Sequence, residues 1–304
     1  YQSAFFLVAK RNKKTDTAGL RMQDFVIAIS DYAKQVDSNF IVIPQNGMEL
    51  AFNNLNIDEG FSADYLAAID GIGIEGLFYN GPLAIDDERL AMARQLVASK
   101  KVLVSESLSD DNNISDAFSK NEAEGFICFP RASNNYDYIF IPDTIHKENN
   151  TNINNLSDAQ NYLYLISTDQ YKNKQDFLQA IAASNFDLVL IDLFFEGSAL
   201  NSSDIQQLKI KANGASRLVI CYMNIAAAES YRYYWDSSWK LHNPSWLKKK
   251  YAGYADEIWV EFWNQDWQDI IYGNDNSYTK KLLDVGFDGV YLDNVEGYYF
   301  LYHN

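Results

Sequence analysis

Histidine, cysteine and proline are scarce in this chain, and the first two shortages narrow its chemistry. The 304 residues include three histidines, two cysteines and five prolines. Zinc sites are usually built with histidine or several cysteines, and His146, His242 and His303 lie in no paired motif, so no metal site of that kind is expected. Cys128 and Cys221 both lie in apolar, strand-like segments, which predicts buried thiols rather than a disulfide.

Positive charge and long apolar runs are lacking as well. Lys and Arg number 25 against 41 Asp and Glu, which gives a net charge of −16. A polyanion would be repelled, so nucleic acid is not an expected partner. The acidity favours a cationic or neutral substrate, or serves solubility alone. No apolar run approaches the ~20 residues that span a membrane. We expect a secreted, periplasmic or cell-surface location, with the signal or lipoprotein segment outside this chain.

Short apolar runs alternate with amphipathic segments throughout the chain. Runs typical of strands begin near residues 39, 70, 101, 162, 187, 217, 257 and 288, and helices are expected between them. Such an alternation is typical of a parallel sheet that is buried on both faces. Eight units in roughly 300 residues predict a single (β/α)8 barrel domain over 1–304, with a doubly wound open sheet as the alternative.

The order of these segments is unusual for a barrel. The chain begins with a helical segment at 20–37 and ends soon after a strand, whereas a barrel strand ordinarily leads into an outer helix. We expect the helix at 20–37 to fill the place after the last strand. A polar, Asn-rich segment, 146–157, has the composition of an exposed linker. Together these features predict a circularly permuted barrel.

The segment "IDGIGIEGLFYNG", 69–81, carries the G-x-G-x-x-G pattern of dinucleotide-binding turns. In those turns the glycines lie between a strand and a helix, whereas here the first two lie within the strand and a Gly-Pro step follows. We therefore expect no dinucleotide cofactor. Side chains alternate along a strand, so Gly71, Gly73 and Glu75 share one face, and the glycines leave space beneath the acid.

Acids recur at the ends of three predicted strands. "DGIGIE", "DLVLID" and "DGVYLD" end at Glu75, Asp192 and Asp293. The C-terminal strand ends form the catalytic face of a barrel, so these side chains should converge, and Glu106 and Glu229 should join them. Two facing carboxylates are the requirement of glycoside hydrolysis. A carboxylate-bound magnesium is the alternative, and the G-x-S-x-G nucleophile motif is absent.

Aromatic residues make up 15% of the chain and cluster after predicted strands. The clusters are "ESYRYYWDSSWKLHNPSW", "EFWNQDWQ" and "NVEGYYFLY". Aromatic rings offer an apolar face for stacking and, in Tyr and Trp, a polar edge. Taken together, the clusters favour a saccharide-binding cleft.

Several segments resemble one known family. "CYMNIAAAESYRYYW", "WVEFWNQDWQDII" and "GFDGVYLDNVEGYY" are similar to the TM1410-like, or glycoside hydrolase family 114, barrels, whose members include endo-α-1,4-polygalactosaminidases. "FIVIPQNGMEL", "IDGIGIEGLFY" and "KKVLVSES" resemble the last three strands of the family, yet here they come first. The resemblance implies a permuted order in which 158–304 holds the first five units, 1–145 the last three, and 146–157 joins them.

The resemblance also implies an activity and a set of site residues. The activity is hydrolysis of an α-linked polysaccharide, such as a galactosamine-containing polymer, by a retaining mechanism without a cofactor. Asp293 is implied as the nucleophile and Glu75 as the acid/base. Supporting or substrate-binding roles are implied for Asn46, Glu106, Asp192, Glu229, Tyr231, Arg232, Trp263 and Glu296.

The chain departs from the family pattern at two places. The family often reads I-S-V-G-E-A-E-S-Y-R, where Ala226 and Ala227 here replace the glycine and the first acid. Glu296 stands where Asp is common. The lost acid keeps open the alternative of a barrel that binds carbohydrate without cleaving it. A carboxylate separation of roughly 5–5.5 Å would indicate retention, and about 6.5–9.5 Å inversion.

Overall fold

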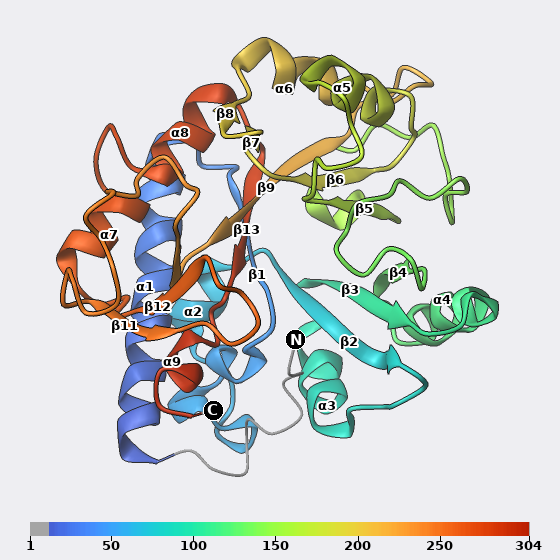
Figure 1. Ribbon diagram of the computed structural model, residues 1–304. Coiled ribbons are helices and arrows are strands. Elements are labelled where there is room, and N and C mark those ends of the chain that lie inside the picture. Colours follow the sequence, from blue (N-terminus) through green and yellow to red (C-terminus); the bar gives the residue numbers. More distant parts are fainter. Residues whose placement is uncertain (1–11, 304) are drawn as a thin grey trace.

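Two parallel sheets form the centre of the computed structural model, which describes residues 12–303 (Figure 1). The five-stranded sheet has the order β1-β13-β9-β6-β5, and the three-stranded sheet has the order β2-β3-β4. Every pairing within them is parallel. The strands are β1 Ile41–Pro44, β2 Gly71–Gly81, β3 Lys101–Leu108, β4 Ile127–Arg131, β5 Tyr162–Leu165, β6 Leu188–Ile191, β9 Leu218–Asn224 and β13 Gly289–Asp293.

The two sheets meet along both of their edges. A parallel bridge joins Gln45, just after β1, to Gly73 of β2, and the Asn46 N–H donates to the Gly73 carbonyl at 2.7 Å. At the other edge β4 lies beside β5, with the rings of Phe129 and Tyr162 5.7 Å apart. No ladder joins β4 to β5 within 12–303. The parallel α/β architecture is confirmed, and a barrel closed by hydrogen bonds at every step is not observed in that range.

One predicted barrel strand lies outside the parallel sheets. The segment beginning at residue 257 forms β12, Glu257–Val260, which pairs antiparallel with β10, Ala227–Glu229, and β11, Leu247–Lys250. That assignment was wrong, and β4 is the eighth parallel strand instead. The reason is visible in the residues. In "EIWVE" only three apolar residues stand between two acids, and the first half of the strand is only partly buried, whereas "GFICF" holds a longer apolar run, as in a buried strand.

The helices lie on the outside of these strands (Figure 1). In α1 an Asn12 cap accepts the N–H groups of Lys14 and Thr15, and one face buries Met22 and Ile29 among other apolar residues. The helices are α1 Lys13–Val36, α2 Ala63–Ala68, α3 Asp87–Leu96, α4 Ile114–Ala123, α5 Lys174–Ala182, α6 Ser202–Leu208, α7 Gln265–Ile271, α8 Tyr278–Val285 and α9 Gly297–Phe300.

Short elements complete the fold. A small antiparallel hairpin pairs β7, Phe194–Phe195, with β8, Ser198–Ala199. The 3-10 helices are η1 Met48–Ala51, η2 Asn53–Leu55, η3 Ile57–Glu59, η4 Asp111–Asn113 and η5 Leu156–Asp158.

The helix at the start of the chain follows the last parallel strand in space. α1 packs against α8 and α9, and Thr15 Oγ1 is hydrogen-bonded to His303 Nε2 at 2.8 Å. β1 lies directly beside β13, with Ile41 opposite Gly289. This is the place that the order of segments predicted for the helix at 20–37. Four parallel strands precede the segment 146–157 in the chain, and four follow it.

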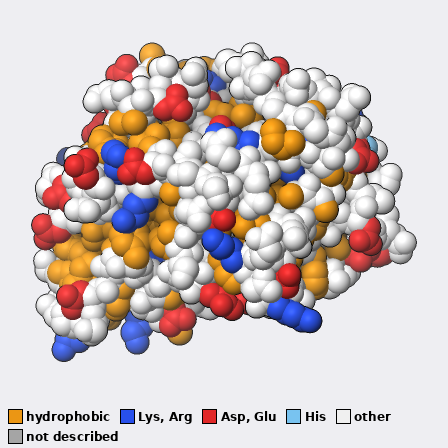
Figure 2. All heavy atoms as spheres, turned by 90° about the horizontal axis from the view of Figure 1, so that it is seen from above, with side chains coloured by type: hydrophobic (Ala, Val, Ile, Leu, Met, Phe, Trp, Pro, Cys, Tyr) orange, Lys and Arg blue, Asp and Glu red, His pale blue; other side chains and the backbone are white. Residues whose placement is uncertain are grey.

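Acidic and basic side chains are interspersed on the surface. Figure 2 shows one face, on which Asp and Glu lie scattered among Lys and Arg, with hydrophobic side chains exposed between them. On this face the acidic side chains are dispersed, which is consistent with a role in solubility.

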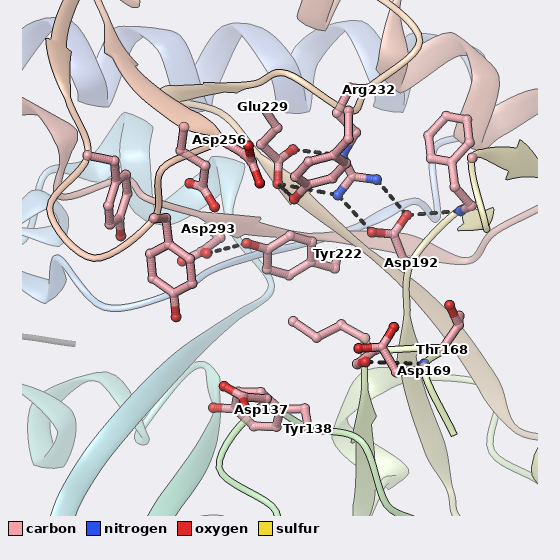
Figure 3. A pocket seen from close by; sticks show the side chains of 18 of the residues that line it. Asp137, Tyr138, Thr168, Asp169, Asp192, Tyr222, Glu229, Arg232, Asp256 and Asp293 are labelled. Carbon is pink, nitrogen blue, oxygen red and sulfur yellow. Dashed lines mark hydrogen bonds and ion pairs between the residues drawn. The ribbon is translucent and has the colours of Figure 1, made fainter. Parts of the chain in front are cut away.

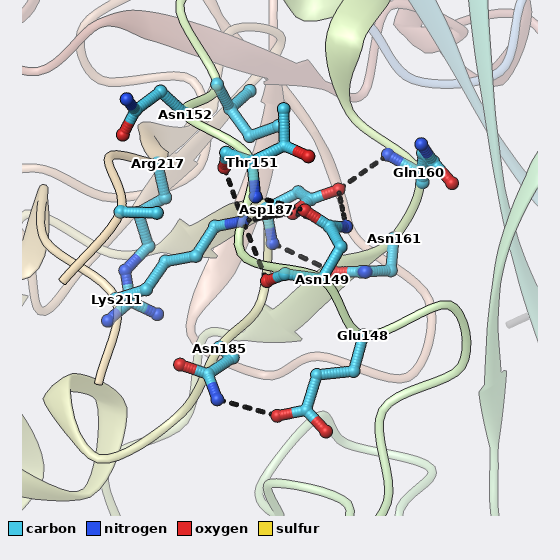
Figure 4. Close-up of polar contacts among 12 residues, drawn as sticks. Glu148, Asn149, Thr151, Asn152, Gln160, Asn161, Asn185, Asp187, Lys211 and Arg217 are labelled. Carbon is cyan, nitrogen blue, oxygen red and sulfur yellow. Dashed lines mark hydrogen bonds and ion pairs between the residues drawn. The ribbon is translucent and has the colours of Figure 1, made fainter. Parts of the chain in front are cut away.

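The polar segment 146–157 is docked rather than free. The Asn149 side-chain amide donates to both carboxylate oxygens of Asp187 at 3.1 Å, just before β6 (Figure 4). Lys211 donates to Asp187 at 2.6 Å and to the Thr151 carbonyl at 3.0 Å. The side chains of Asp187 and Lys211 are fully buried. A buried ion pair therefore fixes this segment at the N-terminal end of the parallel strands.

We predict that Lys211→Met will lower the free energy of unfolding by about 3–5 kcal/mol, because it leaves the Asp187 carboxylate buried without its cation. Lys209→Met is the matched control. Its 2.7 Å pair with Asp288 has side chains that are 25% and 23% exposed, so its loss should be about 1 kcal/mol or less. Urea unfolding at pH 7 measures both. Equal losses in the two variants would contradict the anchoring role of the buried pair.

Candidate active site

Two cavities open at the C-terminal ends of the parallel strands. The larger has a volume of about 1010 Å³ and the smaller one of about 420 Å³. Both are lined by Tyr136, Tyr251, Asp293 and Asn294, so they meet at these residues. The meeting point lies at the end of β13, the strand that carries one of the predicted carboxylates.

Asp293 is buried at this junction and is held from three directions. Its Oδ1 accepts the side-chain amide of Gln45 at 2.8 Å and the backbone N–H of Asn294 at 2.8 Å. Its Oδ2 accepts the Tyr222 hydroxyl at 2.5 Å (Figure 3). Burial, and then the charge of Glu75, raise the pKa of Asp293 to about 7. The carboxyl group thus has a fixed orientation and a titration near neutrality.

Glu75 lies opposite and is half-buried. Its Oε1 accepts the Tyr138 hydroxyl at 2.5 Å, and its Oε2 accepts the same Gln45 nitrogen at 3.0 Å. One amide nitrogen therefore bridges both carboxylates. The sum of its two distances, 5.8 Å, is the largest separation that the bridged oxygens can have. The two carboxyl groups therefore face each other across a single amide, as two-carboxylate glycoside hydrolysis requires.

Gln45 was not singled out from the sequence, although it follows a buried strand directly. Its Oε1 accepts the Tyr164 hydroxyl at 2.8 Å, which fixes the amide with its NH₂ group toward the two acids. Tyr164 and Gln45 are both buried. The available signal was a polar residue at the end of "FIVIP", at the same strand-end position as the predicted acids.

The glycines of β2 have a different role from the one predicted. A Cβ atom at Gly73 would lie 1.9 Å from the hydroxyl oxygen of Tyr291. The space that Gly73 leaves is therefore filled by a ring from β13, and it does not stay open beneath Glu75. Gly76, with a φ of +61°, turns the backbone immediately after the acid.

Asn46 supports the backbone of Glu75 rather than its carboxylate. Its Oδ1 accepts the Glu75 N–H at 3.0 Å and an Arg89 guanidinium N–H at 3.0 Å. Arg89, from α3, also donates to the Glu75 carbonyl at 2.8 Å. Asn46 also lines the smaller cavity, so the structure brings it to the predicted site.

One wall of the larger cavity is an ion-pair network (Figure 3). Arg232 pairs through both terminal nitrogens with Asp192, at 2.8 and 2.7 Å, and through Nε with Glu229 at 2.7 Å. The Tyr231 hydroxyl donates to Glu229 at 2.6 Å. The structure thus brings these four predicted residues together on one side of Asp293.

Glu106 lies outside both cavities. It is fully buried, and its carboxylate accepts the N–H groups of Leu77, Phe78 and Tyr79 and the Asn121 side-chain amide, at 2.9 to 3.2 Å. Burial raises the pKa of Glu106, and these donors oppose the rise. The side chain therefore holds the turn that follows Glu75, and it does not reach the position predicted for it.

Trp263 and Glu296 were both predicted to lie in the site, and the structure brings only Glu296 there. Trp263 lies against α1, with the Arg21 guanidinium 4.6 Å from its ring centre, and it lines neither cavity. Glu296 lines the smaller cavity. Its Oε1 is buried and has no hydrogen-bond partner among the described residues. Burial, and then the nearby charge of Glu49, raise the pKa of Glu296 to about 8.

Glu257 is a cavity residue that the sequence analysis missed. It lies opposite Glu229 across the β10–β12 pair and lines the larger cavity. Burial, and then the charge of Glu229, raise its pKa to about 8. Its strand was assigned to the barrel, so its position at the start of that strand appeared remote from the catalytic face.

Exposed tyrosines surround the larger cavity. Tyr136, Tyr231, Tyr233 and Tyr254 are each between 36% and 59% exposed, and all four line it. Tyrosine rings combine an apolar face with a polar edge, which suits them to line a binding surface. Of the three aromatic clusters that favoured a saccharide cleft, only the first supplies rings to this cavity, Tyr231 and Tyr233, while Phe300 of the third lines the smaller cavity and the second lines neither.

Residues 12–303 show neither a metal-binding cluster nor a membrane-spanning helix. No group of three or more His, Cys, Asp or Glu side chains is arranged there to hold a metal ion. No helix in that range combines the length and the apolar character needed to cross a bilayer.

Paired carboxylates, a bridging amide and a tyrosine-lined cavity on a parallel α/β scaffold are the kind of arrangement that glycoside hydrolysis requires. Comparison with protein families gives a specific result. The model of glycoside-hydrolase family GH114 matches residues 143–304, just over half of the chain. The chain belongs to this family, which confirms the resemblance seen in the sequence.

Three curated relatives match parts of this chain, and their names assign no activity. An uncharacterized protein of Methanocaldococcus jannaschii is 33% identical over 148 residues, covering 49% of this chain and 41% of that protein. An uncharacterized protein of Thermotoga maritima is 31% identical over 118 residues, which cover 39% of this chain and 35% of that protein. An uncharacterized protein of Deinococcus radiodurans is 32% identical over 124 residues, which cover 41% of this chain and 38% of that protein. The chain spans about two fifths of the length of the curated relatives it matches.

We predict that Asp293→Asn will stabilise the fold at pH 8. The pKa of Asp293 rises from 3.8 to about 7 on folding, so the unfolded chain loses this proton first and the free energy of unfolding falls as pH rises from about 4 to 7. Over this range the free energy of unfolding falls by about 4 kcal/mol. Asparagine does not ionise, so the variant does not undergo this fall. Chemical unfolding should show a larger gain at pH 8 than at pH 4.

Asp31→Asn is the control for that comparison, because Asp31 is exposed on α1. Its effect should be small and alike at both pH values. A gain from Asp293→Asn that is the same at pH 4 and pH 8 would contradict the raised pKa.

Proposed function

We propose that the protein is a retaining glycosidase that cleaves an α-linked polysaccharide, with a galactosamine-containing polymer as the candidate substrate. The observation that carries this proposal is the Gln45 amide nitrogen, which bridges Asp293 and Glu75 at the junction of two cavities. Its two bonds limit the bridged oxygens to 5.8 Å, a bound compatible with the carboxyl spacing of about 5–5.5 Å in retaining glycosidases. Membership of GH114 supports glycosidase chemistry in general.

Asp293 suits the role of nucleophile. Three hydrogen-bond donors surround its carboxylate and favour the ionised form. In the first step an Asp293 oxygen bonds to the anomeric carbon as the bond to the leaving oxygen breaks. The donors also prevent rotation of the carboxyl group, so the attacking oxygen stays in place.

Glu75 suits the role of acid/base. It is half-buried and lines the smaller cavity, where a leaving group can reach its carboxyl oxygens. In its protonated form Glu75 gives a proton to the leaving oxygen. It then takes a proton from the water that attacks the anomeric carbon, and Asp293 is released.

The lining of the larger cavity favours a cationic sugar polymer. Its ionisable lining residues include many acids and one arginine, Arg232. Such a cavity attracts ammonium groups, which the amino groups of a galactosamine polymer would supply. A polymer of this kind is met outside the cytoplasm, so the proposal includes a secreted, periplasmic or cell-surface location. The acids are Asp137, Asp169, Asp192, Glu196, Glu229, Asp256, Glu257 and Asp293.

We predict that Asp293→Asn and Glu75→Gln will each lower hydrolysis by at least ~10²-fold while the circular dichroism spectrum stays unchanged. The assay measures soluble fragments released from an α-1,4-linked galactosamine polymer and from a panel of bacterial and fungal exopolysaccharides. Asp31→Asn removes an exposed charge outside both cavities and should retain wild-type turnover.

Three other results of these measurements would contradict the proposed function or one of the assigned roles. Turnover near the wild-type level in either site variant would remove that residue from its role. Binding of oligosaccharides by the wild type without any product would favour the non-catalytic carbohydrate-binding alternative. Loss of activity in EDTA would favour a carboxylate-metal hydrolase.

We further propose that the chain is a circularly permuted GH114 barrel, closed between β4 and β5. Three observations support this. β1 pairs with β13, α1 packs beyond that pair, and the family match begins at residue 143, close to the docked segment. Thr15 and His303 are in contact, so a short link between these regions would restore the ordinary order.

A rearranged chain tests this order directly. We predict that residues 146–303, joined by a short Gly-Ser link to 12–145, will fold with the same circular dichroism spectrum and thermal midpoint within a few degrees. A chain reopened inside β9, at the centre of the five-stranded sheet, should not fold. Failure of the first chain to fold would overturn the proposed permutation.

A further inference from the structure

The turn between β11 and β12 crosses the site. Residues 251–256 join Lys250 to Glu257, and Gly253, with a φ of +91°, allows the reversal. Most of this turn lines the larger cavity, while Tyr251 and Ala252 line the smaller one. The turn therefore lies between the two cavities, at the level of Asp293.

Tyr251 is held firmly in this turn. Its ring stacks on Trp259 at 4.2 Å with an interplanar angle of 15°, and Trp259 stacks on Phe300 at 5.3 Å and 19°. Its hydroxyl donates to the Asn294 side chain at 3.1 Å. Asn294 in turn donates its backbone N–H to Asp293. The stacking on Trp259 and the hydroxyl bond to Asn294 thus hold the ring in one position, so it can form a rigid wall of the cleft.

Tyr136 narrows the same junction from another segment of the chain. It lines both cavities and is 40% exposed. The Arg131 guanidinium lies 5.1 Å from its ring centre and donates to its carbonyl at 2.8 Å. Two tyrosines from distant segments therefore bound the place where the paired carboxylates lie.

The two cavities differ in volume and in the charge of the residues that line them. The larger has more than twice the volume of the smaller and is lined by acids with Arg232 as its cation. The smaller includes Arg131, Lys249 and Lys250 beside Glu75, Asp293 and Glu296. A polymer lying across the carboxylates would place a longer stretch in the larger cavity than in the smaller.

We propose that Tyr251 is a specificity-determining residue that divides the cleft at the scissile bond, so that a short product of fixed length leaves the smaller cavity. This inference rests on the proposed glycosidase function. A rigid aromatic ring beside the cleaved bond gives a sugar ring one stacking position. The number of units beyond it is then set by the volume of the smaller cavity.

The test compares the wild type with Tyr251→Ala and Tyr251→Phe on α-1,4-linked galactosamine oligomers of defined length, labelled at the reducing end. The alanine variant merges the cavities, so the dominant short product should fall several-fold and product lengths should spread. The phenylalanine variant keeps the ring but loses the bond to Asn294. It should keep the product lengths and lose kcat a few-fold, with little change in KM.

Tyr233→Ala is the matched control, because Tyr233 lines only the larger cavity. It should raise KM and leave the product lengths as they are. If circular dichroism shows that the alanine variant at 251 is unfolded, Tyr251→Leu, which keeps an apolar contact with Trp259, is measured in its place and should spread the product lengths likewise.

The outcomes separate this inference from the proposed function. Identical product lengths from the wild type and the variant without the ring would overturn the dividing role and leave the glycosidase assignment standing. No cleavage by the wild type of these oligomers or of any polysaccharide in the panel would overturn the proposed function, and the dividing role with it.

Discussion

The site depends on one neutral donor between two acids. Two carboxylates within 5.8 Å repel each other, and a cation between them would neutralise the nucleophile. The Gln45 amide supplies hydrogen bonds to both without adding charge. Because a single nitrogen makes both bonds, any shift of β1 relative to β2 or β13 would break one of them. The strand order β13-β1, with β2 bridged beyond, is therefore a requirement of the chemistry as much as of the fold.

Burial gives the site its geometry and also a thermodynamic cost. Asp293, Glu257 and Glu296 all have raised pKa values, and burial is the largest cause in each case. A surface pair would titrate normally but would rotate and meet water. Tyr222 and Tyr138 limit the cost by donating to the acids from inside the protein. The surrounding parallel sheets must supply the stability that this cluster consumes.

Local patterns predicted the acids, and contacts between distant segments decided the rest. The five-residue spacing in three strands placed Glu75, Asp192 and Asp293 correctly at one end of the sheets, since parallel strands end together. It did not separate them from Glu106, because a strand-end position leaves open which way a side chain turns. Gln45 and Glu257 were missed for a related reason. Their partners are about 30 residues or more away in the chain, and short strands such as β4 and β12 differ by only a few residues in the length of their apolar runs.

The contact between Gly73 and Tyr291 links two strands that are far apart in the chain. A side chain at position 73 would occupy the place of the tyrosine hydroxyl group, and a smaller residue at 291 would leave an empty volume beside the site. Neither position is therefore free to vary alone. In this family a change in size at one position should be accompanied by a compensating change at the other, so the two halves of the chain are constrained to vary together.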